Sequence, residues 1–200
     1  MSVVLPTHPA PVDAVPSYLD WGGILRPIFG GALQKLRRLG NRFSLAVTLP
    51  PLAYSDSANL GMVWVSHIIG ARDEGAIMSW PQPGLEVGTP GDARMNGGGQ
   101  SGSVIVLRGM TPGYVVRDGQ AFSIIHGGRR YLHISRSYQL VNGAGVVILP
   151  MAPMLRVSPA DGAIVEFFPK IEGLLEGDAQ SWSLDVALNV GLSFTITEMR

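Results

Sequence analysis

Apolar and β-branched segments, broken at short intervals by glycine, cover much of this 200-residue chain. They are most regular from Gly113 to Arg156, where the breaks fall at Asp118-Gly119, His126-Gly127-Gly128 and Asn142-Gly143-Ala144-Gly145. Asp-Gly and Asn-Gly pairs supply the positive φ of tight hairpin turns, which assigns turn roles to Gly119 and Gly143. The stretch therefore predicts an up-and-down meander, and short curved strands of this kind close into small barrels that leave no free edge.

One strand of this meander is expected to follow Arg130. Its alternation places Leu132, Ile134, Tyr138 and Leu140 on one face and His133, Ser135, Ser137 and Gln139 on the other. Arg136 interrupts the apolar face and predicts a bend there or an exit from the core.

The last segment, Ser181 to Glu198, alternates strictly and predicts a half-buried strand that kinks or turns near Gly191. A hairpin with a bulge and a single bent strand both fit this pattern. Trp182, Leu184 and Phe194 are predicted core residues. The full apolar series is Trp182, Leu184, Val186, Leu188, Val190, Leu192, Phe194 and Ile196.

The first hundred residues predict a helix among strands. Strands are expected over 24–29, 34–40 and 42–49, the last because Phe43, Leu45, Val47 and Leu49 alternate with smaller or polar residues. The residues 56–71 predict a helix capped by Ser55 or Asp56, with Trp64 in its buried stripe. Glycine and proline then make 73–103 an expected irregular connector.

Composition adds an expectation about partners. Hydrophobic residues make up 46% of the chain and charged residues only 15%, with 26 glycines, 15 prolines and a formal net charge of +0. Because the glycine and proline content makes a helical core improbable, we expect apolar surface to be hidden against other subunits. A neutral chain offers no field for reading nucleic acid, and no apolar run is long enough for a membrane span.

Two segments are candidate subunit contacts. Lys35, Arg37 and Arg38 form a basic cluster, for which a subunit contact or a solvated strand is favoured over a nucleic-acid patch. Residues 1–17 hold Pro9 and Pro11 in an extended, proline-rich arm. This arm is either disordered or laid on a neighbouring subunit.

The residues that carry catalysis or metal binding are missing in recognisable form, so neither an enzyme nor a cofactor or metal site is expected. Cysteine is absent, and the four histidines lack metal-site spacing, with His126 and His133 read as turn or surface residues. Gly99-Gln100-Ser101-Gly102-Ser103 misses the nucleophile elbow by one position, and a strand is expected to follow it where a helix should.

The order of motifs resembles the distal tail proteins of long-tailed bacteriophages. A strand pair leads to Pro50-Pro51, and a helix follows. Next come the glycine-rich Gly98-Gly99-Gln100-Ser101-Gly102, a small barrel ending in Pro153-Met154-Leu155-Arg156, and a last strand ending at Phe194 to Glu198. The proline-rich start departs from the family's pattern.

The resemblance implies a mainly β fold in which a β-sandwich lobe (1–97 plus 170–200) carries an inserted barrel of the oligonucleotide/oligosaccharide-binding type (98–169). It further implies a homohexameric ring between the tail tube protein and the hub or tip protein, with tail fibres as further candidate partners. Such a ring belongs to the virion tail and is assembled in the bacterial cytoplasm.

Two rival functions stay open. One is a carbohydrate-binding barrel, for which Trp80, Tyr114, Tyr131 and Tyr138 are the available stacking residues. The other is an intracellular enzyme or regulator, which a pocket with convergent polar groups would favour.

Overall fold

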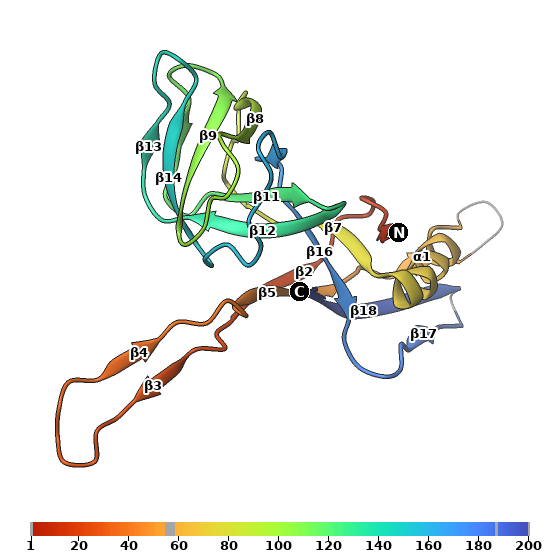
Figure 1. The fold of residues 1–200 in the computed structure, drawn as a ribbon. Coiled ribbons are helices and arrows are strands. Elements are labelled where there is room, and N and C mark those ends of the chain that lie inside the picture. Colours follow the sequence, from red (N-terminus) through yellow and green to blue (C-terminus); the bar gives the residue numbers. More distant parts are fainter. Residues whose placement is uncertain (1, 55–58, 187, 200) are drawn as a thin grey trace.

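A computed structural model describes residues 2–54, 59–186 and 188–199, and shows two sheets and a long projecting hairpin (Figure 1). The elements in chain order are β1 (Val3–Val4), β2 (Asp13–Leu19), β3 (Gly23–Leu25), β4 (Gln34–Leu36), β5 (Arg42–Thr48), β6 (Leu52–Ala53), α1 (Leu60–Glu74), β7 (Ala76–Ser79), β8 (Gly91–Met95), β9 (Val104–Met110), β10 (Val115–Val116), β11 (Ala121–His126), β12 (Arg129–Ser135), β13 (Gln139–Leu140), β14 (Val147–Ala152), β15 (Val165–Glu166), β16 (Lys170–Leu175), β17 (Trp182–Leu184) and β18 (Asn189–Glu198). The predicted mainly β fold is confirmed.

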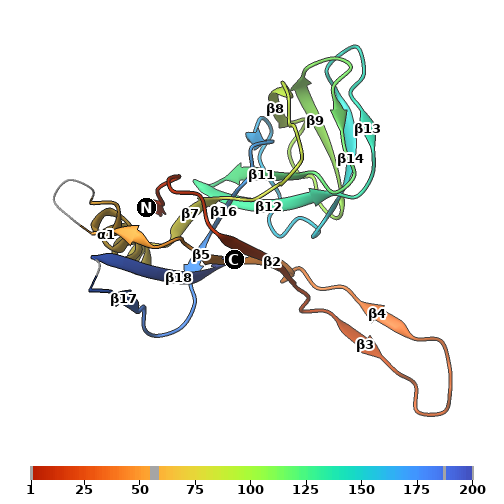
Figure 2. The same cartoon turned by 180° about the vertical axis from the view of Figure 1, so that it is seen from behind.

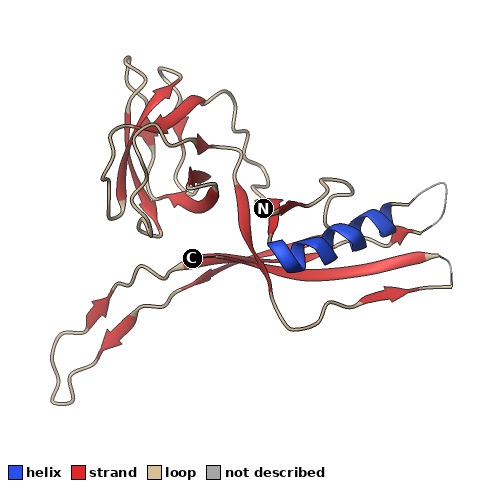
Figure 3. Cartoon of the chain, turned by 45° about the vertical axis from the view of Figure 1, so that its right-hand side comes forward, coloured by secondary structure: helices blue, strands red, loops and turns tan. Residues whose placement is uncertain are grey.

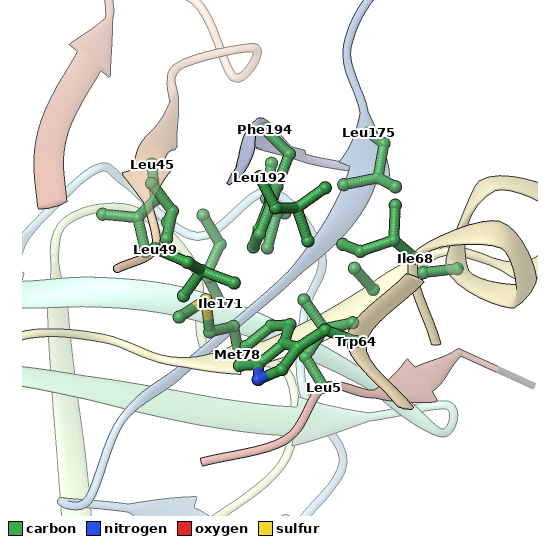
Figure 4. Packing of buried hydrophobic residues seen from close by; sticks show 14 of the residues in the cluster. Leu5, Leu45, Leu49, Trp64, Ile68, Met78, Ile171, Leu175, Leu192 and Phe194 are labelled. Atoms are coloured by element: carbon green, nitrogen blue, oxygen red, sulfur yellow. The ribbon is translucent and has the colours of Figure 1, made fainter. Parts of the chain in front are cut away.

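The first sheet joins segments from both ends of the chain. Its strand order is β1-β7-β16-β18-β5-β2, and β17 and β6 also pair with β18. The helix α1 packs along this sheet (Figure 3), and Trp64, Ile68 and Ala71 enter the same core as Leu45 and Phe194 (Figure 4). The predicted core roles of Trp64 and Phe194 are therefore confirmed.

The second sheet curls into a nearly closed barrel. Its order is β15-β11-β12-β14-β9-β8, and a bridge between Arg94 and Ile164 brings the last strand back beside the first. A separate core of Phe122, Leu149, Phe167 and other buried side chains fills it.

The irregular connector expected over 73–103 is wrong in two places. It contains β7, which pairs with β1 and β16 in the first sheet, and β8, which pairs with β9 in the barrel. Four or five residues are too few to show a period when glycine and proline surround them.

Two turn glycines behave differently. Gly119 has the positive φ that was predicted, 80°. Gly143 lies in a turn but is not among the residues with positive φ; that conformation falls on Gly145, at φ 72°. A Cβ on Gly145 would lie 2.6 Å from the carbonyl oxygen of Met110, so close strand approach requires glycine there.

The helix starts and ends later than predicted. The expected caps, Ser55 and Asp56, lie outside the described residues. The helix begins at Leu60 without a side-chain cap from Asn59, and it ends at Gly75, whose φ is 96° and whose N–H donates to the carbonyl of Ala71. The stripe periodicity located the helix body, while its ends follow from backbone geometry.

The C-terminal alternation forms a hairpin rather than one bent strand, because β17 ends at Leu184 and pairs with β18, which begins at Asn189. Gly191 lies within β18 opposite Ser183, so the chain does not turn there. Trp182 pairs with Leu192 and Leu184 with Val190, so each pair shares a face of the sheet. Leu192 and Val190 are buried, whereas Trp182 is 39% exposed and Leu184 is 67% exposed. The predicted core roles of Trp182 and Leu184 are therefore wrong, because β17 is an edge strand whose apolar face extends beyond its cover.

The strand β12 ends at Ser135, so the bend predicted at Arg136 is confirmed. Tyr138 and Leu140 leave the core face at this bend and are exposed. The surface role expected for His133 is wrong. Its imidazole is buried, stacks on Phe122 at 5.8 Å between ring centroids, and lies 2.9 Å (Nδ1) from the carbonyl oxygen of Pro153.

Two buried carboxylates join the barrel to the first sheet. The Glu198 carboxylate accepts hydrogen bonds from the backbone N–H groups of Phe43 and Leu132, both at 2.8 Å. The carboxylate of Glu172 accepts one from the backbone N–H of Arg130 at 2.9 Å. Carboxylates of the first sheet thus accept hydrogen bonds from backbone N–H groups along one edge of β12. In a continuous sheet a neighbouring strand would accept these bonds.

Two tryptophans, Trp64 on α1 and Trp182 on β17, allow a matched test of this packing. We expect Trp64→Ala to lower the free energy of unfolding by about 3–5 kcal/mol, because it leaves a cavity in the core. Trp182→Ala should cost about 1 kcal/mol or less, because the side chain already meets solvent. Urea unfolding of both variants measures the difference, and equal losses would contradict the assignment of β17 to an uncovered edge.

A second prediction concerns acid. Burial, together with the Arg156 guanidinium, lowers the pKa of His133 from 6.5 to about 3. Between those values the unfolded chain binds the proton and the folded chain does not, so stability falls as the pH falls below 6.5. The loss is about 1.4 kcal/mol per pH unit.

Urea unfolding at pH 7 and pH 5 tests this expectation. The wild-type chain should lose about 2 kcal/mol more than His133→Gln over that interval. His126→Gln serves as the control, since that side chain is only half-buried. An unchanged pH dependence in His133→Gln would rule out the buried neutral imidazole as its source.

Candidate functional site

The hairpin formed by residues 20–41, called the arm below, is the most prominent feature of the surface. It continues the β2–β5 pair, whose register ends at Leu19 opposite Arg42, and projects away from both sheets (Figures 1 and 2). Its own pairing covers only three residue pairs in β3 and β4. Every residue from 24 to 39 is exposed.

The arm is apolar although it is exposed. Phe29, beside Ile28 at the tip, is 98% exposed. The register places Ile24 opposite Lys35 and Leu25 opposite Gln34, so apolar side chains occupy both faces of the ribbon. The exposed large apolar residues of the arm are Trp21, Ile24, Leu25, Ile28, Phe29, Leu33, Leu36 and Leu39.

Polar contacts hold the base of the arm. The Asn41 amide group donates to the Tyr18 hydroxyl at 2.9 Å, and its carbonyl oxygen accepts from the Trp21 N–H at 2.8 Å. The Arg42 guanidinium lies over the Trp21 ring, 5.6 Å from its centroid. The hydrogen bond from the Lys35 ammonium lowers the pKa of Asp20. The arm therefore leaves the body in a defined direction.

The predicted basic contact residues lie on this arm. Arg37 and Arg38 are exposed beyond β4, while Lys35 forms an ion pair with Asp20. Residues 20–41 contain four basic residues and one acidic residue, a local charge of +3 in a neutral chain.

The proline-rich start is ordered on its own chain, so the disordered alternative is wrong, while a contact of Pro9 and Pro11 with a neighbouring subunit stays a prediction. Val3 and Val4 pair with β7, Leu5 is buried, and the carbonyl of His8 accepts the indole N–H of Trp64 at 2.9 Å. Pro9 and Pro11 lie half-buried on their own chain. The segment is ordered by its own subunit, so a contact with a neighbour is not needed to explain it.

A second exposed apolar surface lies at the C-terminal hairpin. We call it the C-terminal hairpin patch and define it by Trp182, Leu184, Val186 and Leu188, all partly or fully exposed. Three acidic residues in exposed positions accompany it, Glu176, Asp178 and Asp185. Of these, Glu176 accepts a hydrogen bond from the Thr197 hydroxyl.

Sequence reasoning missed the buried pair of Arg156 and Glu198. The Arg156 guanidinium donates to the Glu198 carboxylate at 2.7 Å and lies 5.3 Å from the Tyr131 ring centroid. Each belonged to a quoted motif, but no local signal tells that the two motifs meet. Both side chains are buried, and the pair joins the segment after β14 to the end of β18.

The described residues show no arrangement that points to catalysis or sugar stacking. They contain no group of three or more metal-ligating side chains. A cavity of about 270 Å³ beneath the N-terminal segment is lined mainly by apolar side chains, with Thr7, Ser79 and Trp80 as its polar ones. Among the four candidate stacking residues, Trp80 is buried, Tyr114 and Tyr131 are half-buried, and Tyr138 alone is exposed.

The glycine-rich segment before β9 is structural as well. The Gln100 side chain accepts the backbone N–H of Val106 at 2.7 Å and donates to the carbonyl of Asn96 at 2.8 Å. It thereby ties together the chain between β8 and β9.

Comparisons with known proteins add no family. No protein-family model matches the chain, and no curated protein matches it significantly. In the described part of the chain, α1 is too short and too polar to cross a membrane. The site therefore rests on its geometry, which consists of a basic apolar arm and an acidic apolar hairpin.

Because Leu19 and Arg42 are a register pair, the arm can be removed cleanly. Replacing residues 20–41 by Asn-Gly leaves a two-residue hairpin turn. We expect the variant to fold with a melting temperature within a few degrees of the wild type, because residues 24–39 bury nothing. Calorimetry tests this, and loss of cooperative unfolding would mean that the arm supports the core.

Proposed function

We propose that this protein is a structural subunit that assembles with copies of itself into a ring of a phage tail, joining the tail tube to the tip or baseplate. The observation that carries the proposal is the arm, an apolar ribbon that leaves its own subunit and has every residue from 24 to 39 exposed. A two-stranded ribbon is at best marginally stable in water, and exposed apolar surface of this extent marks a protein contact.

The shape of the subunit supports a closed assembly. The arm and the C-terminal hairpin lie at opposite ends of the first sheet (Figures 1 and 2), so a contact between them joins different surfaces of two copies. Contacts of this heterologous kind generate rings when the rotation closes. The hexamer, the tail tube protein and the hub or tip protein as partners, and the virion tail as location all come from the resemblance to distal tail proteins.

The low charge and high apolar content fit the same role. A subunit that hides surface against neighbours needs few solvating charges, and this chain has 15% charged residues. Carbohydrate binding gains no support, because Tyr138 is the one exposed residue among the four candidate stacking residues.

Native mass spectrometry of the wild-type protein tests the proposal, with and without a tail tube protein. We expect one closed species, six copies by the resemblance, and monomers for the variant in which Asn-Gly replaces residues 20–41. Only monomers of the wild type at high concentration, under both conditions, would falsify it.

A further inference from the structure

The charges of the chain are separated in space although their sum is +0. The arm has a local charge of +3 over residues 20–41. Residues 171–199 hold five acidic residues and no basic residue. Two of the five, Glu172 and Glu198, are buried at the junction with the barrel, which leaves Glu176, Asp178 and Asp185 at exposed positions around the C-terminal hairpin patch.

Apolar surface follows the same two segments. On the arm it runs from Trp21 to Leu39 and covers both faces of the ribbon. On the C-terminal hairpin the apolar surface continues a face of the sheet that is buried in the core. Trp182 and Leu184 lie on this face opposite the buried Leu192 and Val190, but they are themselves exposed. Each surface thus offers apolar contact area, and the prevailing charge is basic on the arm and acidic around the C-terminal hairpin patch. A basic side chain near the second surface is Arg72 of α1, whose guanidinium donates to the backbone carbonyls of Leu175, Glu176 and Gly177.

We propose that the arm of one copy docks on the C-terminal hairpin patch of the next copy, with Arg37 and Arg38 facing Glu176 and Asp178. The inference rests on the proposed function, because it names the surface that receives the arm in the ring. Charge complementarity between the two surfaces selects a second copy of this chain as the occupant.

The arm cannot reach the C-terminal hairpin patch of its own chain. Figures 1 and 2 show the arm and β17 at opposite ends of the first sheet, on either side of the strands that separate them. The contact must therefore form between molecules, and it repeats in one direction around the assembly.

A membrane is the strongest alternative occupant for the arm, because an apolar tip with basic residues behind it suits an anionic lipid surface. The distribution of the apolar residues argues against it. A segment that binds at a bilayer interface is buried to a depth of only about 5–10 Å. Leu36, Leu39 and Trp21 are exposed but lie far along the ribbon from the tip residue Phe29, so shallow insertion of the tip would leave them uncovered. A protein surface can cover the whole length.

Charge reversal in three variants tests the pairing. We expect each of two double variants to raise the protein concentration needed for assembly at least tenfold. One is Arg37→Glu with Arg38→Glu, and the other is Glu176→Lys with Asp178→Lys. All four substitutions in one chain should restore it, because every copy then carries both reversed surfaces. Arg117→Glu with Arg129→Glu, exposed positions on the barrel, is the matched control and should assemble like the wild type.

The absence of cysteine permits a direct measurement of proximity. Leu33→Cys and Leu184→Cys proteins, mixed and oxidised, should form mixed disulfide dimers in preference to either homodimer. Each variant is first checked by circular dichroism, so that loss of assembly is not loss of folding.

The outcomes separate this inference from the proposed function. Assembly of the wild type that none of the charge reversals changes would overturn the docking site and leave the ring standing. Monomers of the wild type throughout would overturn both. Wild-type binding to phosphatidylglycerol vesicles that is lost in Ile28→Ser with Phe29→Ser, without any assembly, would assign the arm to a membrane and also overturn the inference.

Discussion

The arrangement of the two sheets depends on hydrogen bonds from the edge of β12 to two carboxylates. Leu132 N–H donates to Glu198, Arg130 N–H donates to Glu172, and Arg156 neutralises Glu198. A buried carboxylate is costly unless it is paired and hydrogen-bonded, and Glu198 meets both conditions with two backbone donors and one guanidinium. The carboxylates come from the first sheet, whereas the donors Arg130, Leu132 and Arg156 come from the barrel segment, so these bonds connect the two units.

That junction leaves the ends of the first sheet available for contacts. The barrel and α1 cover its apolar face in the middle, where Ala121 and Leu132 of the barrel join the same core as Trp64. Beyond this cover the sheet continues outward as the arm at one end and as the C-terminal hairpin at the other (Figure 3). The subunit therefore carries two apolar extensions of opposite local charge at the two ends of one sheet.

Neutral composition and local charge separation have different consequences here. A net charge of +0 gives the molecule as a whole no long-range steering field. Opposite charges on two surfaces of the same chain instead favour one orientation between copies and disfavour contacts between like surfaces. Apolar area would supply most of the free energy of such a contact, and the charges would select its partner.

The sequence by itself determined the class of fold, because period-2 alternation and turn glycines act through local geometry. The strand at residues 42–49, the positive φ of Gly119 and the buried series from Val190 to Ile196 were all predictable. The hairpin expected at Gly119 does not form, because β10 pairs with β13 and not with β11. Only the tertiary structure decided which apolar faces are covered. Trp182 and Phe194 have the same parity in the same alternating run, yet one lies on an uncovered edge and the other beneath α1. The pairing of Arg156 with Glu198 likewise joins positions 42 residues apart, and burial of His133 follows from the barrel's closure. Which apolar faces are buried, and which distant residues pair, depends on where remote segments of the chain meet. A local pattern of residues does not contain this information.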